Sequence, residues 1–171
     1  MFLLILRNGA MNVIDFAIKM EEEHQAYYEK LAAATPIAGL KTIFTMLAGL
    51  EQEHHGVMET LKKEKKGTRT DSKVLDRAKR IFGDLMAERG ALATIKTDLD
   101  AYRYAMKLEA DSVRFYEEMA QKEQSPATKK ILLQIAEEEK HHFNIVENIY
   151  DFVATPNTFL AWGEFSNLKE F

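Results

Sequence analysis

The chain has 171 residues, of which 46% are hydrophobic and 29% are charged, a composition typical of a soluble globular domain with a sizeable core. Its net charge of −4 argues against nucleic acid as a partner, because binding a phosphate backbone needs a basic surface. The sequence contains no cysteine, which excludes disulfides, thiolate nucleophiles, zinc ribbons and cysteine-ligated iron–sulfur centres. This is compatible with a reducing cytoplasm, the location that we expect.

Residues 1–11 precede the first predicted helix and include one continuous apolar run, from Phe2 to Leu6. The run is too short for a signal-peptide core or a membrane span, so we expect no association with a membrane. Met11 is an alternative natural start, because Asn12 makes a good N-cap for the helix that follows. We therefore interpret residues 1–11 as an N-terminal extension that need not belong to the natural chain.

Four long helices are predicted as two hairpins, at about residues 12–34, 35–63, 98–122 and 125–153. Thr35-Pro36 and Ser125-Pro126 each place an N-cap before a proline at the first helical position. The long connection at 67–97 has a weak amphipathic pattern that predicts a short outer helix. A connection of this length favours a crossover to the far end of a four-helix bundle over simple up-and-down order.

The second helix of each hairpin carries Glu-x-x-His inside an apolar stripe. These stripes are Leu40, Phe44, Leu47, Glu51, His54, Met58, Leu61 and Leu132, Ile135, Glu139, His142, Val146, Ile149, Val153. The inward residues predicted for the first helices are Ile14, Ile18, Glu21, Gln25, Tyr28, Ala32 and Tyr102, Ala105, Glu109, Ser112, Tyr116, Met119. Steps of three and four residues are typical of the buried face of a helix. Because buried charges need a partner or a metal, Glu-x-x-His on this face indicates a carboxylate-bridged two-metal site.

The two hairpins share one pattern at a spacing of 88 residues. This offset pairs Glu21 with Glu109, Tyr28 with Tyr116, Glu51 with Glu139 and His54 with His142. An internal repeat of this kind indicates two copies of one structural unit. The repeat also selects Glu139 and His142 over the overlapping Glu138-x-x-His141, because an offset of 87 loses the other matches and His141 lies off the apolar stripe.

If the helices pack as predicted, four carboxylates and two imidazoles meet in the core: Glu21, Glu51, Glu109, Glu139, His54 and His142. Carboxylates this close would raise one another's pKa, and two divalent ions would cancel their charge. The donor set is oxygen-rich and has no soft ligand, which favours iron or manganese over structural zinc. We predict two iron ions, with manganese or a mixed pair as the alternative.

Three further residues lie near this predicted site. Tyr28 and Tyr116, two turns after the first glutamate of their hairpins, are candidate catalytic residues that would hold the ligands by hydrogen bonds. The other interpretation is an ordinary core tyrosine, whose hydroxyl would still need a partner. His24 lies one turn after Glu21, where the repeat has Ser112. It is either a third imidazole at the metals or a supporting or solvated residue.

The motifs resemble the rubrerythrin branch of the ferritin-like superfamily over residues 12–153. They are Ala17-x-x-x-Glu21 with Ala48-x-x-Glu51-x-x-His54, and Ala105-x-x-x-Glu109 with Ala136-x-x-Glu139-x-x-His142. The resemblance implies an all-α ferritin-like bundle with a non-haem di-iron site that reacts with hydrogen peroxide or dioxygen in defence against oxidative stress. It also implies that Glu51 and Glu139 bridge the metals, while Glu21 and Glu109 are terminal and each metal takes one imidazole.

The sequence departs from that family in two respects. Typical rubrerythrins append a rubredoxin domain held by cysteines, so here the electron donor would be a separate protein such as a rubredoxin. They also carry an extra glutamate three residues after the first ligand of the third helix, where this chain has Ser112. That glutamate is associated with the peroxidase-type rearrangement of the site, and its absence favours a symmetrical centre similar to that of bacterioferritin.

The predicted function is therefore a di-iron oxidoreductase that reduces peroxide or dioxygen with an external electron donor. Ferroxidase-like iron handling and a metal-stabilised bundle without turnover are the alternatives. The tail at 154–171 is too apolar for a free end and is expected to pack on the bundle or on a second subunit. A homodimer is the expected assembly.

Overall fold

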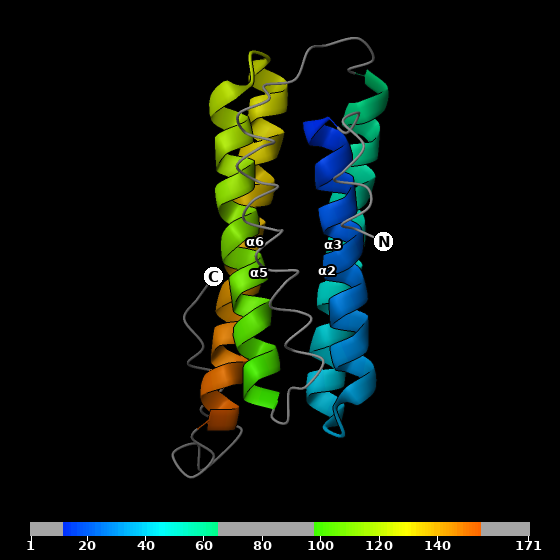
Figure 1. Cartoon of the computed structure of the whole chain (residues 1–171), viewed down its shortest axis with the longest axis vertical. Coiled ribbons are helices and arrows are strands. Elements are labelled where there is room, and N and C mark those ends of the chain that lie inside the picture. The colour runs from blue at the N-terminus through cyan, green and yellow to red at the C-terminus, as the bar shows by residue number, and fades with distance from the viewer. Residues whose placement is uncertain (1–11, 65–97, 155–171) are drawn as a thin grey trace.

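The computed structural model of the chain describes residues 12–64 and 98–154, and this part of the chain is helical except at its turns. The helices are α2 (Val13–Ala34), α3 (Ala38–Glu64), α5 (Asp98–Lys122) and α6 (Pro126–Ala154). They form the all-α four-helix bundle that was predicted (Figure 1). The N-terminal extension, the short helix of the connection and the C-terminal tail lie outside the described residues.

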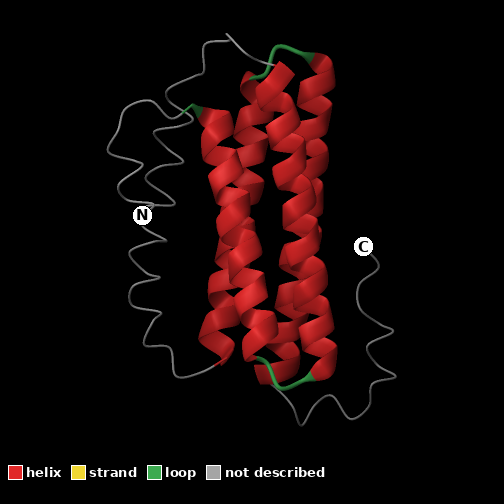
Figure 2. Ribbon diagram, turned by 90° about the vertical axis from the view of Figure 1, so that its right-hand side faces the viewer, coloured by secondary structure: helices red, strands yellow, loops and turns green. Residues whose placement is uncertain are grey.

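The four helices run side by side along the length of the bundle, as two antiparallel hairpins (Figures 1 and 2). α2 packs against α3, α5 packs against α6, and the hairpins meet where α2 lies beside α5 and α3 beside α6. α3 ends at the top of the bundle in Figure 1, whereas α5 begins at the bottom. The segment between them therefore joins opposite ends of the bundle, which confirms the crossover order.

Two of the predicted helix starts are confirmed. The side chain of Asn12 accepts hydrogen bonds from two N–H groups in the first turn of α2, each at 2.9 Å. α6 begins at Pro126, directly after Ser125, whose side-chain hydroxyl accepts the N–H of Thr128 at 3.4 Å. These contacts satisfy donors that a helix N-terminus otherwise leaves without an intrahelical partner.

The N-cap predicted at Thr35 is wrong, because α3 begins three residues later, at Ala38. Thr35 instead closes α2, since its N–H donates to the carbonyl of Leu31 at 3.1 Å. Ile37 precedes α3 directly, and its carbonyl accepts the N–H of Lys41 at 3.0 Å. The residue that ends one helix is therefore not the one that caps the next.

The predicted stripes form the core with few exceptions. All the stripe residues of α3 are buried, and on α6 Val153 alone among those predicted is only partly buried. On α2 the prediction for Gln25 is wrong, because its side chain is half-buried and donates to Glu29 at 2.9 Å. His24 takes the inward position, with 1% of its surface exposed. Residues three and four positions after a buried residue lie near the same face, so periodicity alone does not separate them.

Large side chains join the two hairpins. The rings of Phe16 and Phe115 lie 5.2 Å apart, and those of Tyr27 and Tyr104 lie 4.9 Å apart. The Tyr27 hydroxyl also donates to the carbonyl of Ala101 at 2.9 Å. Each helix pair is closely packed, whereas contact between the hairpins depends more on these long side chains. None of the helices in the described residues combines the length and apolar character needed to cross a membrane.

Replacing Asn12 with alanine should lower the free energy of unfolding by about 1 kcal/mol, because two first-turn N–H groups lose their acceptor. Urea denaturation followed by helical circular dichroism would measure this. Thr35→Ala is the matched control, since its hydroxyl makes a longer bond of 3.3 Å in an exposed turn. Equal losses in the two variants would contradict this assignment of the caps.

Candidate metal centre

The six predicted ligands lie together in the core between the four helices. α2 contributes Glu21, α5 contributes Glu109, α3 contributes Glu51 and His54, and α6 contributes Glu139 and His142. The four glutamates have no exposed surface, and the two histidines are 2% exposed. By contrast, His141 of the rejected register has 40% of its side chain exposed. The structure therefore brings together all six residues, although their binding of a metal stays a prediction.

Each imidazole of the repeat contacts a glutamate of the opposite hairpin. His54 Nδ1 lies 3.1 Å from Glu139 Oε1, and His142 Nδ1 lies 2.9 Å from Glu51 Oε1. The two rings stack with their centroids 5.5 Å apart. Glu51 and Glu139 consequently lie in the middle of the cluster. One half of the cluster contains Glu21 and the other contains Glu109, and a bridging ligand would have to lie between them.

The two tyrosines make a second reciprocal exchange between the hairpins. The hydroxyl of Tyr28 donates to Glu109 Oε1, and the hydroxyl of Tyr116 donates to Glu21 Oε1. Both tyrosines are almost completely buried. Of the two interpretations of these residues, the geometry supports hydrogen bonding to the predicted terminal ligands, which fixes the orientation of each carboxylate.

The four glutamates fall into two electrostatic classes. Burial, followed by the charges of Glu51 and Glu139, raises the pKa of both Glu21 and Glu109 well above the usual value. Burial also opposes ionisation of Glu51 and Glu139. Contacts with neighbouring imidazoles, that with His142 first, nevertheless lower the pKa of these two carboxyls. The central pair is therefore ionised, whereas the outer pair retains its protons to a higher pH.

The same contacts act on the imidazoles in the opposite direction. Burial disfavours the charged ring, but Glu139 and Glu51 outweigh it and raise the pKa of His54 to about 9 and that of His142 to about 10. In the metal-free protein, protons on these rings therefore balance the charge of the central carboxylates at neutral pH. A metal that binds here has to displace those protons.

The donor set fits a centre of two metal ions. Ligand atoms within 4.8 Å of one another form two groups, Glu21, Glu51, His54, Glu139 and His24, Glu51, Glu109, Glu139. Glu51 and Glu139 belong to both groups, as bridging ligands would. Glu21 Oε2 and Glu109 Oε2 are buried and accept no hydrogen bond from any described residue. Carboxylates with a few imidazoles suit iron or manganese.

Glu138, which the repeat excluded as a ligand, contacts the site from outside. Its carboxylate is 55% exposed, and Oε2 lies 2.7 Å from His54 Nε2. This contact holds the ring so that Nδ1 faces the buried carboxylates. The equivalent position in the first hairpin is Leu50, which has no polar side-chain atom. The overlapping Glu138-x-x-His141 motif draws attention to Glu138 in the sequence. The spacing along one helix does not, however, reveal that its side chain contacts His54 on another helix.

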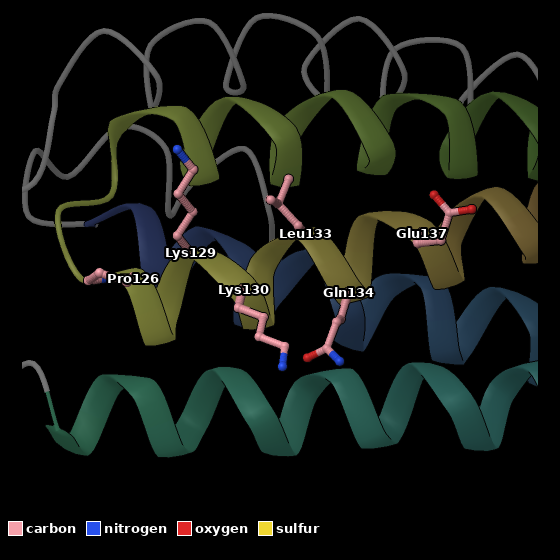
Figure 3. A pocket seen from close by; sticks show the side chains of 6 residues that line it. All are labelled: Pro126, Lys129, Lys130, Leu133, Gln134 and Glu137. Atoms are coloured by element: carbon pink, nitrogen blue, oxygen red, sulfur yellow. The ribbon is translucent and has the colours of Figure 1, made fainter.

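A separate, open depression lies on α6 and is lined by Pro126, Lys129, Lys130, Leu133, Gln134 and Glu137 (Figure 3). All six residues come from one helix, and Leu133 is 45% exposed. The carboxylate that lines this depression belongs to Glu137, which forms an ion pair with Lys140 at 3.2 Å. This surface has no group of metal ligands, so the buried cluster is the candidate site.

Replacing Glu139 with alanine should abolish the binding of two ions, because it removes a donor common to both ligand groups. Glu138→Ala should keep the stoichiometry and weaken the affinity by roughly tenfold, as expected for loss of an outer contact. Metal analysis after anaerobic reconstitution with Fe²⁺ or Mn²⁺ would measure both. The same loss of metal in the two variants would show that the predicted register of ligands is wrong.

Metal affinity should rise with pH between about pH 6 and about pH 8, because ligands must lose the protons that the raised pKa values retain. Calorimetric titration with Mn²⁺ in buffers of different protonation enthalpy would count the protons released. Affinity that does not change over this range would contradict the protonation states described above.

Comparison with known proteins agrees with this geometry. A family model described as Rubrerythrin matches residues 12–150, which include all four described helices except the last few residues of α6. Searches of curated proteins and of solved structures found no match to the chain.

Proposed function

Since the chain belongs to the rubrerythrin family, we propose that it is a non-haem di-iron oxidoreductase that reduces hydrogen peroxide or dioxygen. The observation that carries this proposal is the pair of buried ligand groups that share Glu51 and Glu139. Iron held there would supply electrons to the oxidant by cycling between the ferrous and ferric states.

The residues of the chain would hold the ions and control protons. Reduction of one hydrogen peroxide to two waters takes up two electrons and two protons. Burial, and then the charge of the adjacent glutamate, raises the pKa of Tyr28 and Tyr116 well above the usual value. Each phenol therefore keeps its proton and acts as a donor to Glu109 or Glu21 rather than as a base. Complete burial of the glutamates also excludes bulk water from the ligands.

The proposal includes a separate electron donor, a protein of the rubredoxin type. We place the reaction in the cytoplasm and the protein in a homodimer as parts of the same proposal.

Ferroxidase-like iron handling is the second candidate, and one observation favours it. Ser112 is fully buried three residues after Glu109, at the position of the extra glutamate of typical rubrerythrins. A hydroxyl there cannot replace a carboxylate as a charged ligand. Without that carboxylate, the six predicted glutamate and histidine ligands are paired one to one by the repeat, which supports oxidation of iron without efficient turnover of peroxide.

Stopped-flow absorbance would separate these functions. The protein is loaded anaerobically with Fe²⁺ and mixed with either hydrogen peroxide or dioxygen, and then with a reduced rubredoxin. We expect two irons per chain, faster oxidation by peroxide, and repeated re-reduction by the donor. Glu139→Ala should show none of these changes, because it removes a shared ligand.

Other outcomes would overturn the proposal. Faster oxidation by dioxygen, together with a multi-subunit shell in size-exclusion chromatography, would indicate ferroxidase-like storage. Bound iron that responds to neither oxidant would indicate a metal-stabilised bundle.

A further inference from the structure

The internal repeat is broken at one buried position inside the cluster. His24 lies on α2, one turn after Glu21, and the residue 88 positions later is Ser112 on α5. Both residues are buried, with 1% and 0% of their surface exposed. The two hairpins therefore differ at this position, because α2 offers an imidazole to the cluster where α5 has a serine hydroxyl.

His24 lies within reach of the predicted bridging ligands. Its Nδ1 is 3.6 Å from Glu51 Oε2, while His142 Nδ1 is 2.9 Å from the other oxygen of the same carboxylate. One imidazole therefore approaches each oxygen of Glu51. His24 also belongs to a group of ligand atoms with Glu51, Glu109 and Glu139, all within 4.8 Å of one another.

The neighbours of His24 place it in the half of the cluster that contains Glu109. It comes from the helix that supplies Glu21, yet the ligand group that includes it contains Glu109 rather than Glu21. The Glu21 group contains His54 instead. Serine in the equivalent position of the other hairpin has a shorter side chain and a hydroxyl, which is a much weaker ligand than imidazole for iron, copper or zinc.

We propose that His24 is a third imidazole ligand of the metal centre, on the side of Glu109. With His142, whose Nδ1 lies 3.9 Å from Glu109 Oε2, it gives that half two imidazoles, whereas the Glu21 half has one. The two ions would then bind in distinguishable steps, because a half with more nitrogen donors holds a later divalent metal more tightly. This inference rests on the metal centre of the proposed function but not on its turnover.

The decisive measurement is a count of the bound imidazoles in the Co²⁺-loaded protein. Each imidazole bound to paramagnetic Co²⁺ gives its own hyperfine-shifted, solvent-exchangeable ring N–H resonance in the proton NMR spectrum. Three such signals are expected in the natural sequence. Two signals with both ions bound would overturn the proposal and leave His24 as a residue that only positions Glu51.

Two variants identify the third signal. His24→Ser reproduces the residue found at the equivalent position of the repeat, and it should lose one signal and bind one of the two ions roughly 10- to 100-fold more weakly in chelator competition. Ser112→Ala, the matched control at an equally buried position, should keep three signals. If His24→Ser fails to fold, the count in the natural sequence still decides the matter.

The outcome is independent of the enzymatic proposal. Three imidazole signals in a protein that no oxidant turns over would support His24 as a ligand and overturn the oxidoreductase. Two signals in a protein that reduces peroxide repeatedly would do the reverse.

Discussion

The structure depends on the burial of four carboxyl groups in one bundle core. An isolated carboxylate in such a core would be costly, so each has to be neutralised or paired. Here the compensation is shared between hairpins: imidazoles lie against Glu51 and Glu139, and tyrosine hydroxyls donate to Glu109 and Glu21. Removal of one partner would leave another charge buried, which makes the cluster a single unit rather than a collection of pairs.

This constraint also explains how the two hairpins are held in register. Each hairpin packs closely on itself, but the contacts of the cluster join residues that are far apart in the chain, such as His54 and Glu139. The site is therefore complete only where the two hairpins are docked against each other. The repeat supplies a nearly two-fold framework, and two differences from symmetry, His24 for Ser112 and Glu138 for Leu50, make the surroundings of its two halves unequal.

The sequence predicted those helix starts that depend only on contacts between residues close together in the chain. Asn12 and Ser125 cap their helices as expected, because the contacts of a cap lie within a few residues. Thr35 does not, because α3 begins only at Ala38, so the hydroxyl of Thr35 accepts the N–H of Ile37 in the turn before the helix. The choice between His24 and Gln25 also lay beyond periodicity, since both are within a turn of Glu21 and only the rotation of α2 against its neighbours selects one.

The sequence by itself determined that two hairpins of one pattern turn a carboxylate or a Glu-x-x-His pair toward a common core, because helical spacing and the 88-residue repeat need no knowledge of packing. The tertiary structure alone decided the partners: His142 with Glu51, Tyr28 with Glu109, and His24 beside the same carboxylate as His142. Helical spacing specifies which residues share a face of one helix. Contacts between helices depend on their rotation and axial offset, which are set only when the whole bundle packs.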